Sequence, residues 1–314
     1  MVGTLVTPVG GLSGRRPKED AGGWPSLYPI HTSLMNPCQR SALVTSFLLG
    51  ACLLHDRSYL RGETCAPTCG APDGGNSRLD EAATSDACPR GRGPTMVRVH
   101  SAHPFCIDST EVTRADYIEF TSEVVGVAPN QPPECAWNTS LTPEVAATGG
   151  ATNLPVRGVD WCDARAYCEW AGKRLCGRIG GGTLRREQGD DPSVSEWYAA
   201  CSRDGERRFP YGDTFDASAC AVEAPAPDPV RTHPKCEGGF AGLFDMSGSV
   251  FEWTDMCDSE DAHANCYARG GSYFRNPSAN PTADPRAYGC SGVGSYPAAR
   301  STLGVDVGFR CCAP

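Results

Sequence analysis

The chain is poor in basic residues, in histidine and in long apolar runs, and each shortage argues against a class of protein. It has 314 residues, with 28 Lys and Arg against 37 Asp and Glu, which gives a net charge of −9. Because the basic residues are scattered, we expect no nucleic-acid partner. The sequence contains no glycine-rich phosphate loop, nucleophile elbow or helical pair of metal-binding histidines. Isolated histidines such as His233 and His263 are typical of surface loops.

Cysteine, glycine and proline are, by contrast, abundant. The chain has 36 glycines and 26 prolines, which predicts many loops and turns over a modest core. Its 18 cysteines would be a liability in a reducing cytosol. We therefore expect disulfides formed in an oxidising compartment.

The N-terminal region has the order of an export signal. After Met35 come one positive charge at Arg40, a short apolar stretch over residues 42–49, and Leu49-Gly-Ala-Cys52, which resembles a bacterial lipobox. We expect residues 1–52 to be a leader and signal peptide. Lipidated Cys52 would then anchor the protein to a membrane in the periplasm or at the cell surface. The alternative is a plain transmembrane anchor, but the apolar stretch is well short of the ~20 residues that span a bilayer.

Residues 53–95 are rich in glycine, proline and acidic residues and predict a tether. Cys65 and Cys69 in this segment could bind a metal, but no second cysteine or histidine pair stands at matching spacing, so we favour disulfides. Residues 96–314 form the expected folded domain, which we expect to be monomeric.

Alternating apolar residues between 97 and 108 predict a first strand. Ser109 or Thr110 could cap a helix that continues to Val125. We expect its buried side to carry Tyr117, Ile118 and Phe120.

Two further helices follow in the predicted domain. Asp160 can cap a helix that ends at Gly172. The segment 176–192 reads as an inserted surface loop, which could distinguish what the protein binds. After it, Ser193 and Glu196 have the spacing of a capping box for a third helix.

Five phrases in the second half of the chain carry a family resemblance. They resemble the formylglycine-generating enzyme (sulfatase-modifying factor) family, in that family's order. The resemblance implies an α+β fold, a variant of the C-type lectin fold that is low in regular secondary structure and rich in disulfides. The phrases are Pro155-Val-Arg-Gly-Val-Asp-Trp161, Tyr167-Cys-Glu-Trp-Ala-Gly-Lys-Arg-Leu175, Gly242-Leu-Phe-Asp-Met-Ser-Gly-Ser-Val-Phe-Glu-Trp253, Arg269-Gly-Gly-Ser272 and Gly308-Phe-Arg-Cys311.

The resemblance implies two long-range disulfides, and sequence proximity suggests further bridges. An odd number of cysteines in the domain means that one is free or pairs with the tether. The family pattern implies Cys168 with Cys311 and Cys201 with Cys290. Proximity suggests Cys257 with Cys266, Cys220 with Cys236 and, more weakly, Cys106 with Cys135, which leaves Cys162, Cys176 and Cys312.

A calcium site is a further expectation. Asp245 and Glu252 flank a glycine-containing bend, and carboxylates mixed with carbonyls suit a hard cation. The resemblance implies that Asp245 and Glu252 bind through side chains, and Gly248 and Val250 through carbonyl oxygens. The alternative is that Asp245 caps a turn and Glu252 faces water beside Trp253.

The family's copper-binding cysteine pair is missing. Its two positions correspond here to Arg275 and Asn280, downstream of the retained Ser272. Copper(I) requires soft thiolate ligands, which neither residue supplies, so we expect no copper. A triple-histidine iron centre, as in ergothioneine-forming relatives, is equally unsupported.

Two classes of function remain. In the first, the domain is a recognition module for a peptide, glycan or protein partner, with a groove lined by Arg269, Tyr273, Phe274 and Arg275. In the second, it is an oxidoreductase of the same family. That enzyme would be a maturation oxidase without copper, or a formylglycine-generating oxidase that acts on a sulfatase cysteine.

Overall fold

The structure is a computed structural model that describes residues 87–125, 131–145, 150–222, 224–275, 284–292 and 295–314. These residues belong to one compact unit, 76–314. Residues 1–52, with Cys52, and most of the tether lie outside the described ranges. Within those ranges, no helix is both long enough and apolar enough to cross a membrane.

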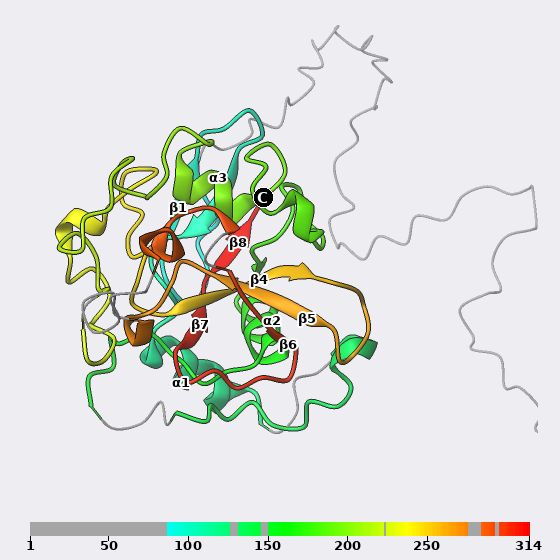
Figure 1. The fold of residues 1–314 in the computed structure, drawn as a ribbon. Helices are drawn as coiled ribbons and strands as arrows, with labels where there is room; N and C mark the ends of the chain where they lie inside the picture. Colours follow the sequence, from blue (N-terminus) through cyan, green and yellow to red (C-terminus); the bar gives the residue numbers. More distant parts are fainter. Residues whose placement is uncertain (1–86, 126–130, 146–149, 223, 276–283, 293–294) are drawn as a thin grey trace, which may run out of the picture. The chain divides into compact units, whose positions relative to one another are not determined.

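The regular elements are short and are joined by long irregular segments (Figure 1). The strands are β1 Met96–Val99, β2 Phe105–Asp108, β3 Arg174–Leu175, β4 Phe251–Cys257, β5 Asn265–Arg269, β6 Tyr296–Ala299, β7 Val307–Phe309 and β8 Cys311–Ala313. The α-helices are α1 Arg114–Glu123, α2 Trp161–Trp170 and α3 Glu196–Ser202. The 3₁₀ helices are η1 Pro133–Cys135, η2 Arg186–Gln188, η3 Pro234–Cys236, η4 Tyr273–Arg275 and η5 Pro285–Tyr288.

Two four-stranded sheets organise the domain. The first has the order β1-β2-β8-β3 and is antiparallel throughout. The second has the order β6-β5-β4-β7, and in it β4 and β7 run parallel. Only Arg310 separates β7 from β8, so the chain passes from one sheet to the other at this residue. In Figure 1, α3 lies beside β1 and β8 of the first sheet, whereas α1 lies at the opposite end.

The first helix starts later than predicted. Its cap is Thr113, whose side chain accepts from the Asp116 backbone N–H in a capping box. The predicted caps Ser109 and Thr110 were wrong, because this segment pairs with strands instead. The Ser109 N–H donates to the Thr95 carbonyl, and the Val112 N–H donates to the Phe309 carbonyl.

The second helix agrees with the prediction, and the third differs at its cap. Asp160 caps α2, and Gly172 follows its end with a φ of 73°. The cap of α3 is Ser195, not Ser193, since the Ser193 hydroxyl is bound to Asp191.

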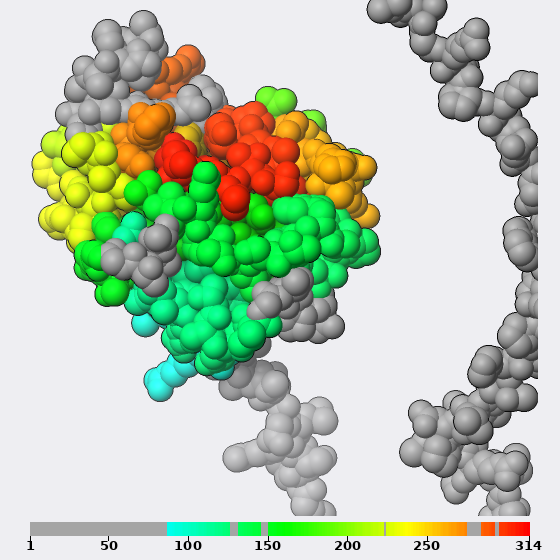
Figure 2. All heavy atoms as spheres, turned by 90° about the horizontal axis from the view of Figure 1, so that it is seen from below, coloured from blue at the N-terminus to red at the C-terminus, as the bar shows by residue number. Residues whose placement is uncertain are grey.

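An aromatic cluster joins α1, α2 and β7. Tyr117 and Phe120 of α1 are buried as predicted, whereas Ile118 is only half-buried. Tyr167 contacts both aromatic rings of α1 and lies 5.2 Å from the Phe309 ring, between centroids. The segment after β6 also packs on α2, where the Arg300 guanidinium lies 4.3 Å from the Trp161 ring centroid. Figure 2 shows this C-terminal segment (red) beside residues from the middle of the chain (green).

All fourteen cysteines of the described residues form disulfides. The resemblance implied Cys168–Cys311 and Cys201–Cys290, and the structure forms both. The bridge between Cys106 and Cys135 was wrong, because η1 places Cys135 beside the first turn of α2. The full set is Cys88–Cys106, Cys135–Cys162, Cys168–Cys311, Cys176–Cys312, Cys201–Cys290, Cys220–Cys236 and Cys257–Cys266.

The odd cysteine of the domain pairs with the tether. Cys88 bonds to Cys106 on β2. The same segment is held elsewhere, because Lys173 donates to the Pro94 carbonyl and the Arg92 guanidinium lies over the Trp170 ring. Residues 87–95 therefore pack against the folded domain.

Candidate functional site

A buried ion pair stands where the two sheets meet. Arg310 and Glu252 are both almost fully buried, and the guanidinium donates to both carboxylate oxygens at 2.7 Å. The Trp197 indole N–H donates to the same carboxylate at 2.8 Å. Arg310 also donates to the carbonyls of Asp108 and Phe244. The pair thus ties β4 to the junction of β7 and β8.

Two more carboxylates face this guanidinium. The Arg310 Nη2 lies 3.9 Å from Glu111 Oε2, and neither Glu111 oxygen has a hydrogen-bond partner among the described residues. Burial, followed by the negative charge of Asp245, raises the pKa of Glu111 well above its usual value. Burial thus favours the neutral form of Glu111.

The predicted calcium ligands lie in and around this cluster. Glu252 is buried, so it does not face water, and its oxygens accept from Arg310 and Trp197. Asp245 has a φ of 61° and accepts the Arg231 backbone N–H at 2.7 Å. These groups fit calcium poorly, because a guanidinium already holds the carboxylate that would bind the ion.

The other two predicted ligand positions are buried backbone positions. Gly248 has a φ of 76°, and a Cβ there would lie 2.6 Å from the Ala221 carbonyl oxygen. Val250 is fully buried. Across the described ranges, no group of three or more His, Cys, Asp or Glu side chains could hold a metal ion. The calcium site stays a prediction.

The Gly-Gly-Ser loop has little open space around it. Ser272 is fully buried, and its hydroxyl donates to Asp306 Oδ2 at 2.5 Å. Gly271 has a φ of 78°, and a Cβ there would lie 2.6 Å from the Tyr288 ring. Glycine is required at this position for both reasons.

The residues that follow Ser272 differ widely in exposure. The Tyr273 hydroxyl accepts from Arg157 at 2.9 Å and the residue is buried, whereas Phe274 is 70% exposed. Arg275 ends η4. Asn280 lies outside the described residues.

Arg269 does not line a groove as predicted. It is 2% exposed, and its guanidinium donates to the carbonyls of Gly189 and Cys290 and to the Asp190 carboxylate. It also lies 5.1 Å from the Trp197 ring centroid. The side chain points inward from the end of β5 and holds the loop 176–192 through hydrogen bonds to Gly189 and Asp190. Its role is therefore structural.

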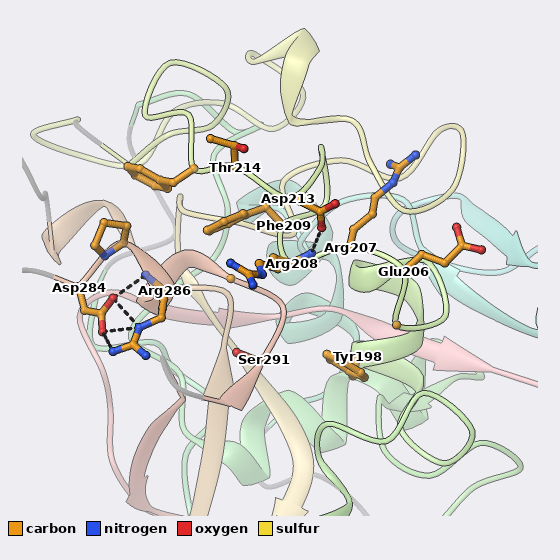
Figure 3. A pocket seen from close by; sticks show the side chains of 14 residues that line it. Tyr198, Glu206, Arg207, Arg208, Phe209, Asp213, Thr214, Asp284, Arg286 and Ser291 are labelled. Atoms are coloured by element: carbon orange, nitrogen blue, oxygen red, sulfur yellow. Dashed lines mark hydrogen bonds and ion pairs between the residues drawn. The ribbon is translucent and has the colours of Figure 1, made fainter.

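An open cavity that sequence reasoning missed lies beside η5 (Figure 3). Its volume is about 960 Å³, and its walls come from segments 205–215 and 284–291 with Tyr198 of α3. The close-up shows Arg208 projecting into the middle, with Glu206 and Arg207 directed outward. Only the adjacent arginines beside Pro210-Tyr-Gly-Asp213 could have hinted at it, since the opposite wall is far away in sequence.

The described part of the chain is thus a disulfide-stapled α+β domain. Its Glu-Trp strand is bound to its Gly-Phe-Arg strand by a buried ion pair. Residues 72–313 match the sulfatase-modifying factor enzyme 1-like domain (FGE-sulfatase), and the chain belongs to this family.

Relatives with different printed names match all or part of this region. The inactive C-alpha-formylglycine-generating enzyme 2 of Mus musculus is 26% identical over 268 residues, which are 71% of this chain and 79% of the relative. Hercynine oxygenase of Mycolicibacterium smegmatis is 34% identical over 107 residues, or 32% of this chain and 21% of that enzyme. The serine/threonine-protein kinase pkn1 of Chlamydia caviae is 32% identical over 107 residues, but the match spans only 14% of the kinase.

Solved structures of similar fold include PvdO from Pseudomonas aeruginosa. It is 19% identical, with a TM-score of 0.46, and the match covers 67% of this chain and 80% of PvdO. CarF is 20% identical, with a TM-score of 0.41 and coverage of 71% and 96%.

Proposed function

We propose that the chain is an exported, lipid-anchored member of this family that recognises a peptide, glycan or protein partner and does not generate formylglycine. One observation carries the proposal: within the described residues every cysteine is bound in a disulfide. The family's copper(I) centre uses free thiolates, and this part of the domain offers it none.

The residues at the two copper-ligand positions agree with this proposal. Arg275 carries a guanidinium, which cannot act as a thiolate, and Asn280 offers only an amide. Ser272 remains, but its hydroxyl is bound to Asp306. The name of the mouse relative describes it as inactive, which supports the proposal.

Export is supported by the density of disulfides, since seven bridges form and persist in an oxidising compartment. The anchor rests on the lipobox-like sequence that ends at Cys52. In a bacterial host, wild-type chain should fractionate with membranes and yield an N-terminal peptide with diacylglycerol on Cys52. The Cys52→Ser variant should be soluble and unlipidated. Wild-type protein recovered in the soluble fraction with a free Cys52 would contradict the anchor.

The activity test uses the purified full chain with copper(I), oxygen and a Cys-x-Pro-x-Arg peptide of the sulfatase type. We expect mass spectrometry to show unmodified cysteine, while a copper-dependent member of the family converts the same peptide. Formylglycine in the wild-type reaction would refute the proposal. Turnover that persists with a copper chelator would indicate the oxidoreductase without copper.

Calcium binding is tested on the same preparation. An ion held by Asp245 would raise the melting temperature in calcium over that in chelator, and the Asp245→Asn variant would lose the rise. Because Arg310 holds Glu252, we expect no rise.

A further inference from the structure

We propose that the cavity around Arg208 binds a carboxylate of a peptide partner, with an apolar side chain of that peptide held beside it. This inference rests on the proposed recognition function and names its site. The site comprises Arg208, Phe209, Tyr198 and Ser291, bordered by the Asp284–Arg286 pair.

Arg208 is the cation that remains available in the cavity. No described residue forms a hydrogen bond or ion pair with its guanidinium, although its backbone is held on both sides. The Arg208 N–H donates to Asp213 Oδ1 at 3.2 Å, and its carbonyl accepts from the Cys290 N–H at 2.8 Å. A guanidinium offers paired N–H donors that match the two oxygens of a carboxylate. The backbone of Arg208 is thus held in place, and its guanidinium remains available to a ligand.

The other charges of the cavity are already compensated or directed away. Arg286 donates to both oxygens of Asp284. Asp213 is turned toward the Arg208 backbone, and Glu206 lies 3.4 Å from Arg203 outside the cavity. Of the three lining arginines, Arg286 is paired with Asp284 and Arg207 donates to the Pro210 carbonyl, so the Arg208 guanidinium is the one whose donors remain for an anionic group of a ligand.

The apolar lining favours a peptide over a sugar. The half-buried rings of Tyr198 and Phe215 offer apolar surface to a ligand, and the buried Phe209 ring supports that of Phe215. The Phe209 ring stacks on Tyr211 at 5.5 Å and contacts Phe215 at 5.7 Å between centroids. What remains is an apolar wall suited to an aliphatic or aromatic side chain. A volume of about 960 Å³ has room for several peptide residues.

The two walls are linked covalently behind the cavity. The Cys201–Cys290 disulfide joins α3 to the segment that carries Ser291. Gly289 approaches the Arg208 carbonyl so closely that a Cβ there would lie 3.1 Å from the oxygen. The site is thus formed before the ligand arrives, which lowers the entropic cost of binding.

The test measures fluorescence anisotropy of the full chain with three labelled peptides. The first holds one glutamate between two leucines and has blocked ends. The second replaces the glutamate by glutamine, and the third is the glutamine peptide with a free C-terminal carboxylate. These arms distinguish a side-chain carboxylate from a terminal one. We expect saturable binding of at least one acidic peptide and none of the blocked glutamine peptide.

Arg208→Gln should weaken that binding by about tenfold to a hundredfold, the usual effect of losing a charged hydrogen-bond pair. Arg208→Lys should retain part of the affinity, since it keeps the charge but not the paired donors. Arg178→Gln removes an equal charge from the loop 176–192 and should change nothing. Circular dichroism and melting temperature confirm that each variant is folded.

Several outcomes overturn the inference. The first is the absence of saturable binding for both acidic peptides. The second is an equal affinity of wild type and the Arg208→Gln variant for an acidic peptide. A third is Arg208-dependent binding of an oligogalacturonate but not of the peptides, which would make the ligand an acidic glycan. The formylglycine assay is independent of all of them. Arg208-dependent peptide binding together with turnover would keep this site and refute the proposed function.

Discussion

At the residue scale, Arg310 is the group on which the junction of the sheets depends. Its guanidinium neutralises Glu252 in a site without water access and satisfies two backbone carbonyls. Arg310→Met should lower the free energy of unfolding by about 3–5 kcal/mol, because the buried Glu252 carboxylate loses its cation. Guanidinium denaturation measures the loss, with Arg178→Gln as an exposed control. A loss below about 1 kcal/mol would mean that the pair is not the junction's main support.

A second residue-scale prediction concerns acidity at the start of α2. Burial, and then the charge of Asp160, raise the pKa of Asp163 to about 8. The folded protein keeps this proton between pH 4 and 8, whereas the unfolded chain releases it near pH ~3.9. The stability that the folded protein gains by holding this proton is thus fully present below pH ~4 and is lost as pH rises toward about 8.

The Asp163→Asn variant should lose this dependence. Its free energy of unfolding should fall less between pH 4 and 8 than that of wild type, by at most about 1.4 kcal/mol per pH unit. Urea denaturation across this range gives both slopes. Parallel slopes would show that Asp163 is ionised in the folded state.

At the element scale, the loop 176–192 has turns of its own and is also joined to β5 through side-chain contacts. Asp190 binds Arg269 and also accepts the Gly292 N–H at 2.7 Å. Asp190→Ala should cost about 1–3 kcal/mol of stability, since Arg269 then loses its carboxylate partner. It should also speed tryptic cleavage at the exposed Arg185. Asp191→Ala removes a neighbouring charge that does not contact β5, and equal effects of the two variants would contradict this role.

Elements whose signals are local could be predicted from the sequence, and those set by distant partners could not. The cap and end of α2 follow from Asp160 and Gly172, residues whose own chemistry starts and stops a helix. Ser109 is by its chemistry equally suited to cap a helix. Backbone hydrogen bonds to Thr95, just before β1, and to Phe309 of β7 instead hold residues 109–112 in strand-like pairing. The sequence did not indicate that Arg269 would be covered by the inserted loop.

The candidate site shows the same limit. The absence of the first copper-ligand cysteine could be read from the sequence at Arg275, because it lies three residues after the recognised phrase that ends at Ser272. The cavity was not, because Arg208 and Ser291 are far apart in the sequence and only the folded domain brings them to one cavity.

At the scale of the whole molecule, two disulfides close nearly the same loop. Cys168–Cys311 and Cys176–Cys312 have sequence separations of 143 and 136 and end at adjacent residues. Replacing either pair by alanine should cost only about 2–3 kcal/mol, because the other still closes the long loop. Replacing both should cost about 7–8 kcal/mol, more than the sum.

Denaturant unfolding of the two double variants and the quadruple variant tests this coupling. The bridge Cys257–Cys266 provides the control, since its separation is 9 and it shortens the two long loops, within which it lies, only slightly. Its removal should add to that of either long bridge without coupling. Strictly additive costs for the two long bridges would contradict their redundancy.

The bridge between Cys88 and Cys106 also determines how the domain bears mechanical load. A stretching force applied to the chain before Cys88 reaches β2 directly through the disulfide. β1 and the turn between β1 and β2 therefore do not bear this force. From β2 the tension passes to β8, which two more disulfides tie to α2 and to Cys176 just after β3. Covalent bonds lie along much of this path. The domain should therefore withstand shear at its N-terminal attachment far better than its short strands suggest.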